Sequence, residues 1–260
     1  MQRRRLIAAA SLLATGLPPG CALADEFEGD PYRSHLWPAL RAETIGAKAR
    51  WRFDDRVEVQ GPAFAEDPMN VPVTVRARLD GVQRIVVVVD RNPIKKVLEL
   101  QPVAALPVVS FRFKLEQASP VRALVQTQDG QWHVGGTWVD SAGGGCTVSG
   151  ATRADGSWSK TLGEVSGRSF SSPPGNEGGS RLRLRIMHPM DTGLVSGIPA
   201  FYLSRLSLRD ARQRELLRLQ TFEPLSENPV LSFDFRPAPP GPLRVVGTDN
   251  NGNRIDTVLP

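Results

Sequence analysis

The sequence predicts an all-β protein of two antiparallel β-sandwich domains, with one short helix near the N-terminus. Three observations predict this class. Short segments rich in β-branched residues recur along the chain, turn-forming dipeptides separate them, and a stretch rich in Gly, Ser and Pro divides the chain past its middle. About seven strands precede that stretch and six follow it, which is typical of two sandwiches.

The first 24 residues have the pattern of a signal peptide. Three arginines at positions 3–5 precede an apolar segment over residues 6–17, and Ala22-Leu23-Ala24 matches a cleavage signal. We expect cleavage after Ala24 and export of the mature chain to the periplasm. Cys21 leaves with the leader unless it is lipidated, which the preceding Pro18-Pro19-Gly20 does not favour.

Charge and hydropathy argue against two classes of function. The full chain has 32 Lys and Arg against 27 Asp and Glu, and removing the three leader arginines leaves 29 against 27. A mature net charge of +2 does not indicate a nucleic-acid-binding protein. After the leader, no apolar segment reaches the roughly 20 residues needed to cross a bilayer. We therefore expect no nucleic-acid partner and no membrane association once the leader is removed.

The first domain, residues 25–161, begins with the helix. Ser34 is a candidate cap, Pro38 falls near the first turn, residues 39–44 favour a helix, and Gly46 ends it. Seven strands are then expected at 56–60, 71–79, 83–90, 97–100, 108–116, 121–128 and 131–139. The dipeptides that mark turns between them are Asp80-Gly81, Asn92-Pro93 and Asp129-Gly130.

Residues 162–180 are rich in Gly, Ser and Pro and are expected to be the linker to a second domain, residues 181–260. Its strands are expected at 182–187, 201–208, 216–222, 230–235, 243–247 and 254–259. Asp249-Asn250-Asn251-Gly252 is a candidate hairpin turn, and residues 237–241 can only be a loop because they hold three prolines. Residues 209–219 leave a helix open as an alternative, since they are rich in good helix formers.

Cys146 is the only cysteine that remains once the leader is removed. It follows Gly143, Gly144 and Gly145, and three successive glycines favour neither helix nor strand. We therefore expect an exposed thiol on a flexible loop, with no fixed cation beside it to lower its pKa. An unpaired thiol in an exported protein indicates chemistry at sulfur. The alternative is a glycine turn that carries a small apolar residue.

The other candidate side chains predict neither a catalytic nor a metal site, and no cofactor. Among the three histidines, His35 is expected in solvent before the helix. His133 lies on a predicted strand and could act as a base for Cys146 only if the loop folded back. His188 and Met190 supply too few donors for a copper site, so a turn is favoured.

Several motifs resemble one known family. Residues 138–146 resemble the end of SoxY, the sulfur-carrier subunit of bacterial sulfur oxidation, and residues 37–41 resemble its N-terminal helix. Residues 185–193, 198–200, 226–229 and 249–252 resemble, in order, the hallmarks of its partner SoxZ. The fused arrangement is similar to the quinoprotein dehydrogenase-associated SoxYZ-like carrier proteins. The resemblance implies that both sandwiches are immunoglobulin-like.

The resemblance also implies a function. The protein would be a non-enzymatic covalent carrier that holds a sulfur-containing or related group on Cys146. Its partners would be periplasmic redox or sulfur-processing enzymes, a quinoprotein dehydrogenase system among them. In SoxY the cysteine lies near a free C-terminus, whereas here the chain continues beyond Cys146, so the arm becomes a loop.

Two alternatives stay open. The first is an accessory docking or assembly module for a quinoprotein dehydrogenase, in which Cys146 has no covalent role. The second is a thiol enzyme that uses Cys146 with His133 as its base.

Overall fold

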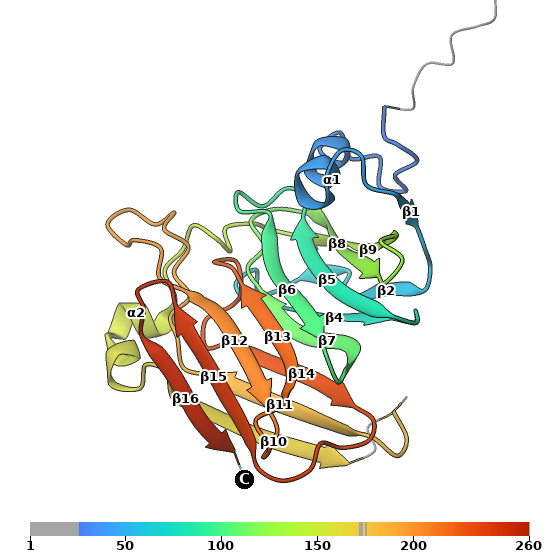
Figure 1. Cartoon of the computed structure of the whole chain (residues 1–260). Helices are drawn as coiled ribbons and strands as arrows, with labels where there is room; N and C mark the ends of the chain where they lie inside the picture. Colours follow the sequence, from blue (N-terminus) through green and yellow to red (C-terminus); the bar gives the residue numbers. More distant parts are fainter. Residues whose placement is uncertain (1–25, 172–173, 175, 260) are drawn as a thin grey trace, which may run out of the picture.

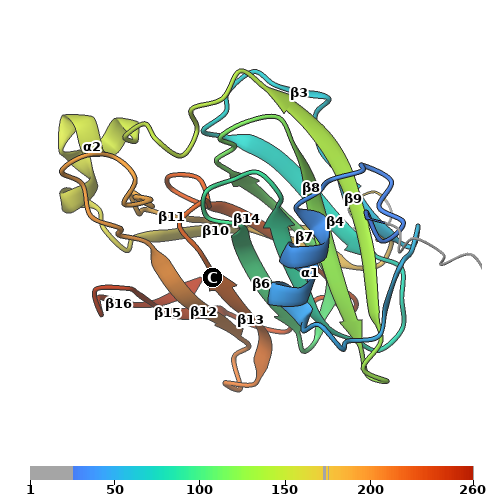
Figure 2. The same ribbon diagram turned by 90° about the horizontal axis from the view of Figure 1, so that it is seen from above.

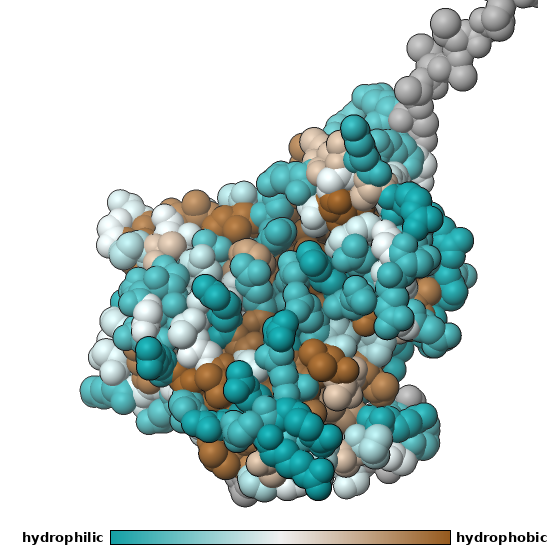
Figure 3. Space-filling view, viewed as in Figure 1, coloured by the Kyte–Doolittle hydropathy of each residue, from teal (hydrophilic) through white to brown (hydrophobic). Residues whose placement is uncertain are grey.

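The computed structural model describes residues 26–171, 174 and 176–259. The expected signal peptide and Cys21 lie outside the described residues. Strands account for 47% of the structure and helices for 7%, which confirms the all-β class with a short helix near the N-terminus. Figure 1 shows two layers of strands, and Figure 3 shows hydrophilic residues over most of the face seen in that view. Among the described residues, no helix is long and apolar enough to cross a membrane.

The larger sheet crosses the whole molecule. Its ten strands are β1 (Trp51–Phe53), β3 (Phe64–Ala65), β5 (Val82–Val89), β6 (Lys96–Pro102), β8 (Ser119–Thr127), β9 (Trp132–Ser141), β12 (Leu203–Arg209), β13 (Glu215–Thr221), β15 (Leu243–Asp249) and β16 (Arg254–Leu259). They follow the order β1-β9-β8-β5-β6-β13-β12-β15-β16, with β3 also paired to β9. Only β1 and β3 run parallel to their partner.

The smaller sheet is antiparallel throughout its described strands. These are β2 (Val57–Gln60), β4 (Val71–Ala77), β7 (Ala105–Phe113), β10 (Val165–Ser171), β11 (Ser180–Ile186) and β14 (Val230–Phe235), in the order β10-β11-β14-β7-β4-β2. All thirteen strands expected from the sequence are present, although their ends differ by a few residues. The expected turns fall between them, and Gly81, Gly130 and Gly252 supply the positive φ that tight turns need.

Both sheets continue across the boundary between the two expected domains. β6 pairs with β13, with Leu100 opposite Leu219, and β7 pairs with β14, with Ser110 opposite Ser232. One core cluster holds the inward-facing apolar residues of both halves. The two sandwiches are therefore joined edge to edge, and this pairing covers four strand edges that would otherwise be open to other chains.

The helix α1 (Trp37–Ile45) lies on the outer face of the larger sheet (Figures 1 and 2). It buries Trp37 and Leu40 in a second apolar cluster, against residues of β5, β8 and β9. This cover explains why residues 85–89 form an unbroken apolar run, since β5 is buried on both faces. Gly46 ends the helix with a φ of 94°, as expected, but Ser34 provides no side-chain cap.

A buried ion-pair cluster fixes the segment before α1 to the sheet. Arg122 on β8 donates to both carboxylate oxygens of Asp30, at 2.6 and 2.8 Å, and of Asp90, at 2.7 and 2.9 Å. All three side chains have no exposed surface. Burial by itself would raise the pKa of Asp30, but the hydrogen bonds and charge of Arg122, together with the backbone N–H groups of Ser34 and Tyr32, outweigh it and lower that pKa.

The expected linker over residues 162–180 is wrong in part, because β10 occupies Val165–Ser171 and pairs with β11 along its length. A Cβ at Gly167 would lie 2.6 Å from Leu259 Cδ1. The small residues that suggested a linker thus permit close packing at the edge of the sheet.

The helix left open over residues 209–219 is not formed, since the segment joins β12 to β13 through a turn. Two short strands, β1 and β3, were not expected. Neither was α2 (Ala151–Asp155) or the 3-10 helix Ser157–Lys160 that follows it.

Candidate functional site

The glycine run before Cys146 folds back onto the chain just after β7. The Gly144 N–H donates to the Glu116 carbonyl at 3.0 Å, and the Gly145 N–H donates to the Leu115 carbonyl at 3.2 Å. The expectation of a flexible, exposed loop is therefore wrong for this conformation. Backbone hydrogen bonds hold the glycine run against residues 115–116. These residues are distant in the sequence, so local patterns could not predict the contact.

The run needs glycine for close approach rather than for mobility. A Cβ at Gly145 would lie 2.2 Å from the Pro68 carbonyl oxygen and 2.7 Å from both the N and O atoms of Leu115. Gly143 and Gly144 have φ values of 92° and 85°, which residues with a side chain rarely adopt. The glycines thus allow the chain to turn and then to lie directly against two other backbone segments.

Cys146 is buried, with no exposed surface, so the expected exposed thiol is also wrong. Its Sγ lies 3.6 Å from the Lys114 carbonyl oxygen. Burial, reinforced by the charge of Glu116 and only partly offset by that of Lys114, raises the pKa of the Cys146 thiol to about 12. In this conformation the thiol stays protonated at neutral pH and cannot act as a nucleophile.

Two side chains clamp the cysteine backbone, one from each half of the chain. A carboxylate oxygen of Glu116 accepts the Cys146 N–H at 2.9 Å, and the other accepts the Thr147 hydroxyl at 3.1 Å. The Thr192 hydroxyl donates to the Cys146 carbonyl at 2.7 Å. Because Thr192 belongs to the second half, the thiol segment lies where the two halves meet.

A lysine that sequence reasoning missed lies beside the thiol. Lys114 is 2% exposed, and its ammonium donates to the Met190 carbonyl. Burial lowers the pKa of Lys114, while the charges of Cys146, Asp191 and Glu227 oppose that shift. Lys114 lies 32 residues before Cys146 in the sequence. The expectation of no fixed cation beside the thiol is therefore correct for the residues adjacent to Cys146 in the sequence, but not for the folded chain.

Residues 188–193 form the expected turn, which packs against the thiol site. The Met190 N–H donates to Nδ1 of His188 at 3.1 Å, and Asp191 pairs through its backbone with Phe201. Arg153, on α2, donates to Asp191 at 2.9 Å. Within the described part of the chain, no group of three or more His, Cys, Asp or Glu side chains is arranged to hold a metal ion.

The other two histidines lie away from the thiol. His133 stands near the start of β9, whereas Cys146 follows the end of that strand. Its Nδ1 lies 2.7 Å from Oδ2 of Asp54, which engages the ring in a separate contact. His35 is exposed, as expected, and pairs with Glu26 at 3.0 Å. The His133 base required by the thiol-enzyme alternative is thus not placed beside Cys146.

His188 predicts a pH dependence of folding stability. Burial lowers the pKa of His188 to about 4, although the nearby Asp249 carboxylate favours the charged ring. The unfolded chain, with a pKa near 6.5, takes up the proton first. The contribution of His188 to the free energy of unfolding is therefore fully present above about pH 6.5. It falls by roughly 3 kcal/mol as the pH drops towards 4. Urea unfolding across this range measures the loss, and His188→Asn should flatten it. An unchanged slope in that variant would contradict the assignment.

Gly145→Ala is expected to expel the thiol segment. The added Cβ has no space between Pro68 and Leu115, so residues 143–147 must leave their site, and alkylation of Cys146 should accelerate at least tenfold. Gly144→Ala is the matched control, because nothing lies within 4 Å of a Cβ there and only backbone strain of about 1 kcal/mol is added. Equal acceleration in both variants would show that sterics at Gly145 do not hold the segment.

Comparison with known proteins places this arrangement in a class. Residues 41–146 match the family model of the sulfur oxidation protein SoxY, and residues 174–259 match that of the sulphur oxidation protein SoxZ. The two domains indicate a sulfur-oxidation carrier protein. More particularly, one polypeptide matches a SoxY model followed by a SoxZ model, and the SoxY match ends at Cys146.

Two solved structures match part of the chain at low sequence identity. The sulfur carrier protein SoxY from Chlorobium limicola f thiosulfatophilum is 21% identical over 40% of this chain and 90% of that one, with a TM-score of 0.36. The superoxide reductase (neelaredoxin) from Ignicoccus hospitalis is 13% identical over 35% of this chain and 94% of that one, with a TM-score of 0.31. No curated protein matches the sequence.

Proposed function

We propose that the protein is a periplasmic covalent carrier that holds a sulfur-containing or related intermediate on Cys146. The observation that carries this proposal is the SoxY match, which ends at the cysteine that is the only free one among the described residues. Sγ displaces a leaving group from an electrophilic centre that a partner enzyme delivers, and the thiol proton passes to solvent. The partners are periplasmic redox or sulfur-processing enzymes, and a quinoprotein dehydrogenase system is one candidate.

The closed site adds a requirement for loading. Residues 143–147 must leave their contacts with Glu116 and Thr192 before Sγ can reach a partner. Release returns the thiol to solvent, where its pKa falls towards the ordinary value and thiolate becomes available. A partner that competes for the Glu116 carboxylate or the Thr192 hydroxyl would thus couple docking to activation. Between loading events, burial protects the thiol from oxidation.

Mass spectrometry of the protein purified from its host tests the proposal. We expect an adduct on the Cys146 peptide, and we expect Cys146→Ser to abolish function in the host. The variant retains nearly the same volume, and its hydroxyl can donate to the Lys114 carbonyl, so thermal unfolding should confirm that it folds. A clean thiol together with full complementation by Cys146→Ser would overturn the carrier proposal.

The burial of Cys146 favours a second candidate, a docking or assembly module for a quinoprotein dehydrogenase. Here the cysteine is only a small apolar residue at the junction of the two halves. Cys146→Ser and Cys146→Ala would then both support function, and the dehydrogenase should copurify with either variant. The carrier requires the thiol itself, so the two candidates give opposite results in the same strains.

The periplasmic location rests on the leader pattern and has its own test. N-terminal sequencing of the protein from a periplasmic fraction should begin at Asp25. A chain that begins at Met1 in the cytoplasmic fraction would contradict export.

A further inference from the structure

The outer face of the smaller sheet carries a marked excess of arginine. Along β11, buried leucines point inward and alternate with arginines that point outward, and β10, β14, β7 and β4 continue the same face. The outward arginines are Arg76, Arg112, Arg168, Arg181, Arg183 and Arg185. The carboxylates on this face are Asp234 on β14 and Glu58 on β2. Six arginines against two carboxylates leave an excess of four positive charges.

The ion pairs in the described chain leave five of these six arginines without a carboxylate partner, and four of the five are exposed. Asp234 accepts from Arg181 at 2.7 Å, and Glu58 pairs with Arg78 at 2.9 Å. Arg112, Arg168, Arg183 and Arg185 are all exposed, and no carboxylate in the described part of the chain forms an ion pair with them. We call these four residues, together with Phe170, the arginine face.

The register of β10 and β11 places two of these cations directly against each other. Arg168 is the cross-strand partner of Arg183 on the same face. Like charges at directly opposite positions destabilise a sheet. The chain therefore carries an arrangement that lowers its own stability, and an anion bound across the pair would remove that repulsion.

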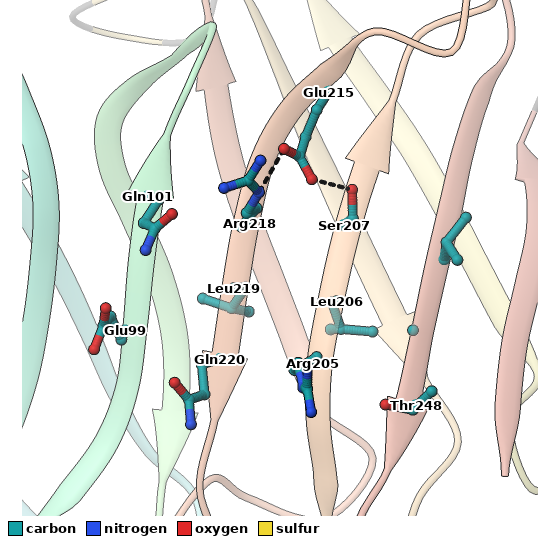
Figure 4. Close-up of a pocket in the computed structure, with 12 residues that line it drawn as sticks. Glu99, Gln101, Arg205, Leu206, Ser207, Glu215, Arg218, Leu219, Gln220 and Thr248 are labelled. Atoms are coloured by element: carbon teal, nitrogen blue, oxygen red, sulfur yellow. Dashed lines mark hydrogen bonds and ion pairs between the residues drawn. The ribbon is translucent and has the colours of Figure 1, made fainter. Parts of the chain in front are cut away.

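The outer face of the larger sheet gives the contrast. There a groove of about 530 Å³ crosses β6, β13, β12 and β15, and three of the four charged side chains that line it form ion pairs, with Arg205 as the exception. Figure 4 shows Glu215 accepting from both Arg218 and Ser207. Glu99 in the same groove pairs with Arg84. Exposed arginines without a carboxylate partner are thus more numerous on the smaller sheet than in this groove.

The shape and composition of the arginine face fit a protein partner. A shallow groove of about 620 Å³ runs across it, lined in part by Arg112, Arg183 and Phe170. From β10 to β7 the arginines span three strand spacings, or about 14 Å, which is more than one small anion can bridge. Phe170 is 40% exposed beside Arg168, and arginine with exposed aromatic rings is the composition of protein-binding surfaces.

We propose that the arginine face docks an acidic surface of a partner protein. Its position adds a consequence that rests on the proposed carrier function. Arg112 lies at the end of β7, two residues before Lys114, and β7 leads directly into the segment that holds Cys146. A protein seated on the arginine face would therefore lie next to the thiol segment and could receive it on release.

Site-specific photocrosslinking of the full chain in its host tests the docking surface. The photoreactive residue replaces Ser232, which lies opposite Arg183 at the centre of the face, and in a control replaces Ser207 on the other sheet. We expect Ser232 alone to crosslink one protein, through a segment of net negative charge identified by mass spectrometry. Arg168→Glu with Arg183→Glu should reduce that crosslink at least tenfold. Arg205→Glu, an exposed arginine on the larger sheet, should change it less than twofold.

Four outcomes would overturn the proposal: no crosslink from Ser232 above the Ser207 control, a crosslinked segment that is not acidic, crosslinking to nucleic acid, or a crosslink that survives reversal of both arginines. Arg183→Gln is a milder variant in case the double variant misfolds. It should weaken the crosslink because it removes one positive charge without adding a negative one. The adduct on Cys146 is measured in the same strains. Crosslinking without any adduct on Cys146 would support the docking surface and contradict the carrier function. An adduct without crosslinking would support the carrier function and contradict the docking surface.

Discussion

Cys146 is expected to react with iodoacetamide roughly a thousandfold more slowly in the folded protein than in the unfolded chain. Burial raises its pKa to about 12 from an ordinary value near 9.0, and each unit lowers the thiolate fraction about tenfold near neutral pH. Closed contacts also block access to Sγ, so reaction in the folded state must proceed through transient release of the segment. Rates of mass increase in buffer and in guanidinium chloride measure the ratio.

Removal of one clamp provides the control for this result. Thr192→Val keeps the side-chain shape but loses the 2.7 Å hydrogen bond to the Cys146 carbonyl, so the reaction should accelerate about five- to tenfold, as expected for one lost hydrogen bond of roughly 1 kcal/mol. A wild-type rate within about fivefold of the unfolded rate would mean that the closed conformation is not the resting state in solution.

Arg122→Leu is expected to destabilise the fold by about 3–5 kcal/mol, because it leaves the carboxylates of Asp30 and Asp90 buried and without their cation. Urea unfolding measures the loss. The effect should shrink at low pH. The pKa of Asp30 is lowered in the folded state, so its contribution is present above the ordinary value near 3.8 and is lost as the pH falls through the folded value.

An exposed pair supplies the matched control. Arg244 and Asp256 lie on the surface of β15 and β16, 2.6 Å apart, and Arg244→Leu should change the urea unfolding midpoint far less than Arg122→Leu does. Replacing all three members of the buried cluster together, as Asp30→Asn, Asp90→Asn and Arg122→Met, should cost less than Arg122→Leu alone. Equal losses at the buried and exposed sites would contradict the role of the cluster.

Local sequence signals are sufficient for most of the strands. Runs such as residues 71–77 and 182–186 alternate apolar and polar side chains, and the turn dipeptides between strands need no distant partner to form. The linker prediction failed at β10 because composition alone does not reveal pairing. Gly167 and its serine neighbours lack apolar bulk, yet seven residues of backbone pair with β11 and supply the stability that the side chains do not.

The fold class, the two halves and the identity of the one free thiol in the described chain can all be predicted from residue type and local spacing. The burial of that thiol depends on residues that are distant in the sequence and meet it only in the folded chain. The residues that form hydrogen bonds with Cys146 are Lys114, Glu116 and Thr192, which lie 30 to 46 positions away in the sequence. Because glycine increases the flexibility of an isolated chain, Gly145 and its neighbours predicted an exposed loop. The same missing Cβ lets the segment lie against Leu115 and Pro68, where it closes over the sulfur.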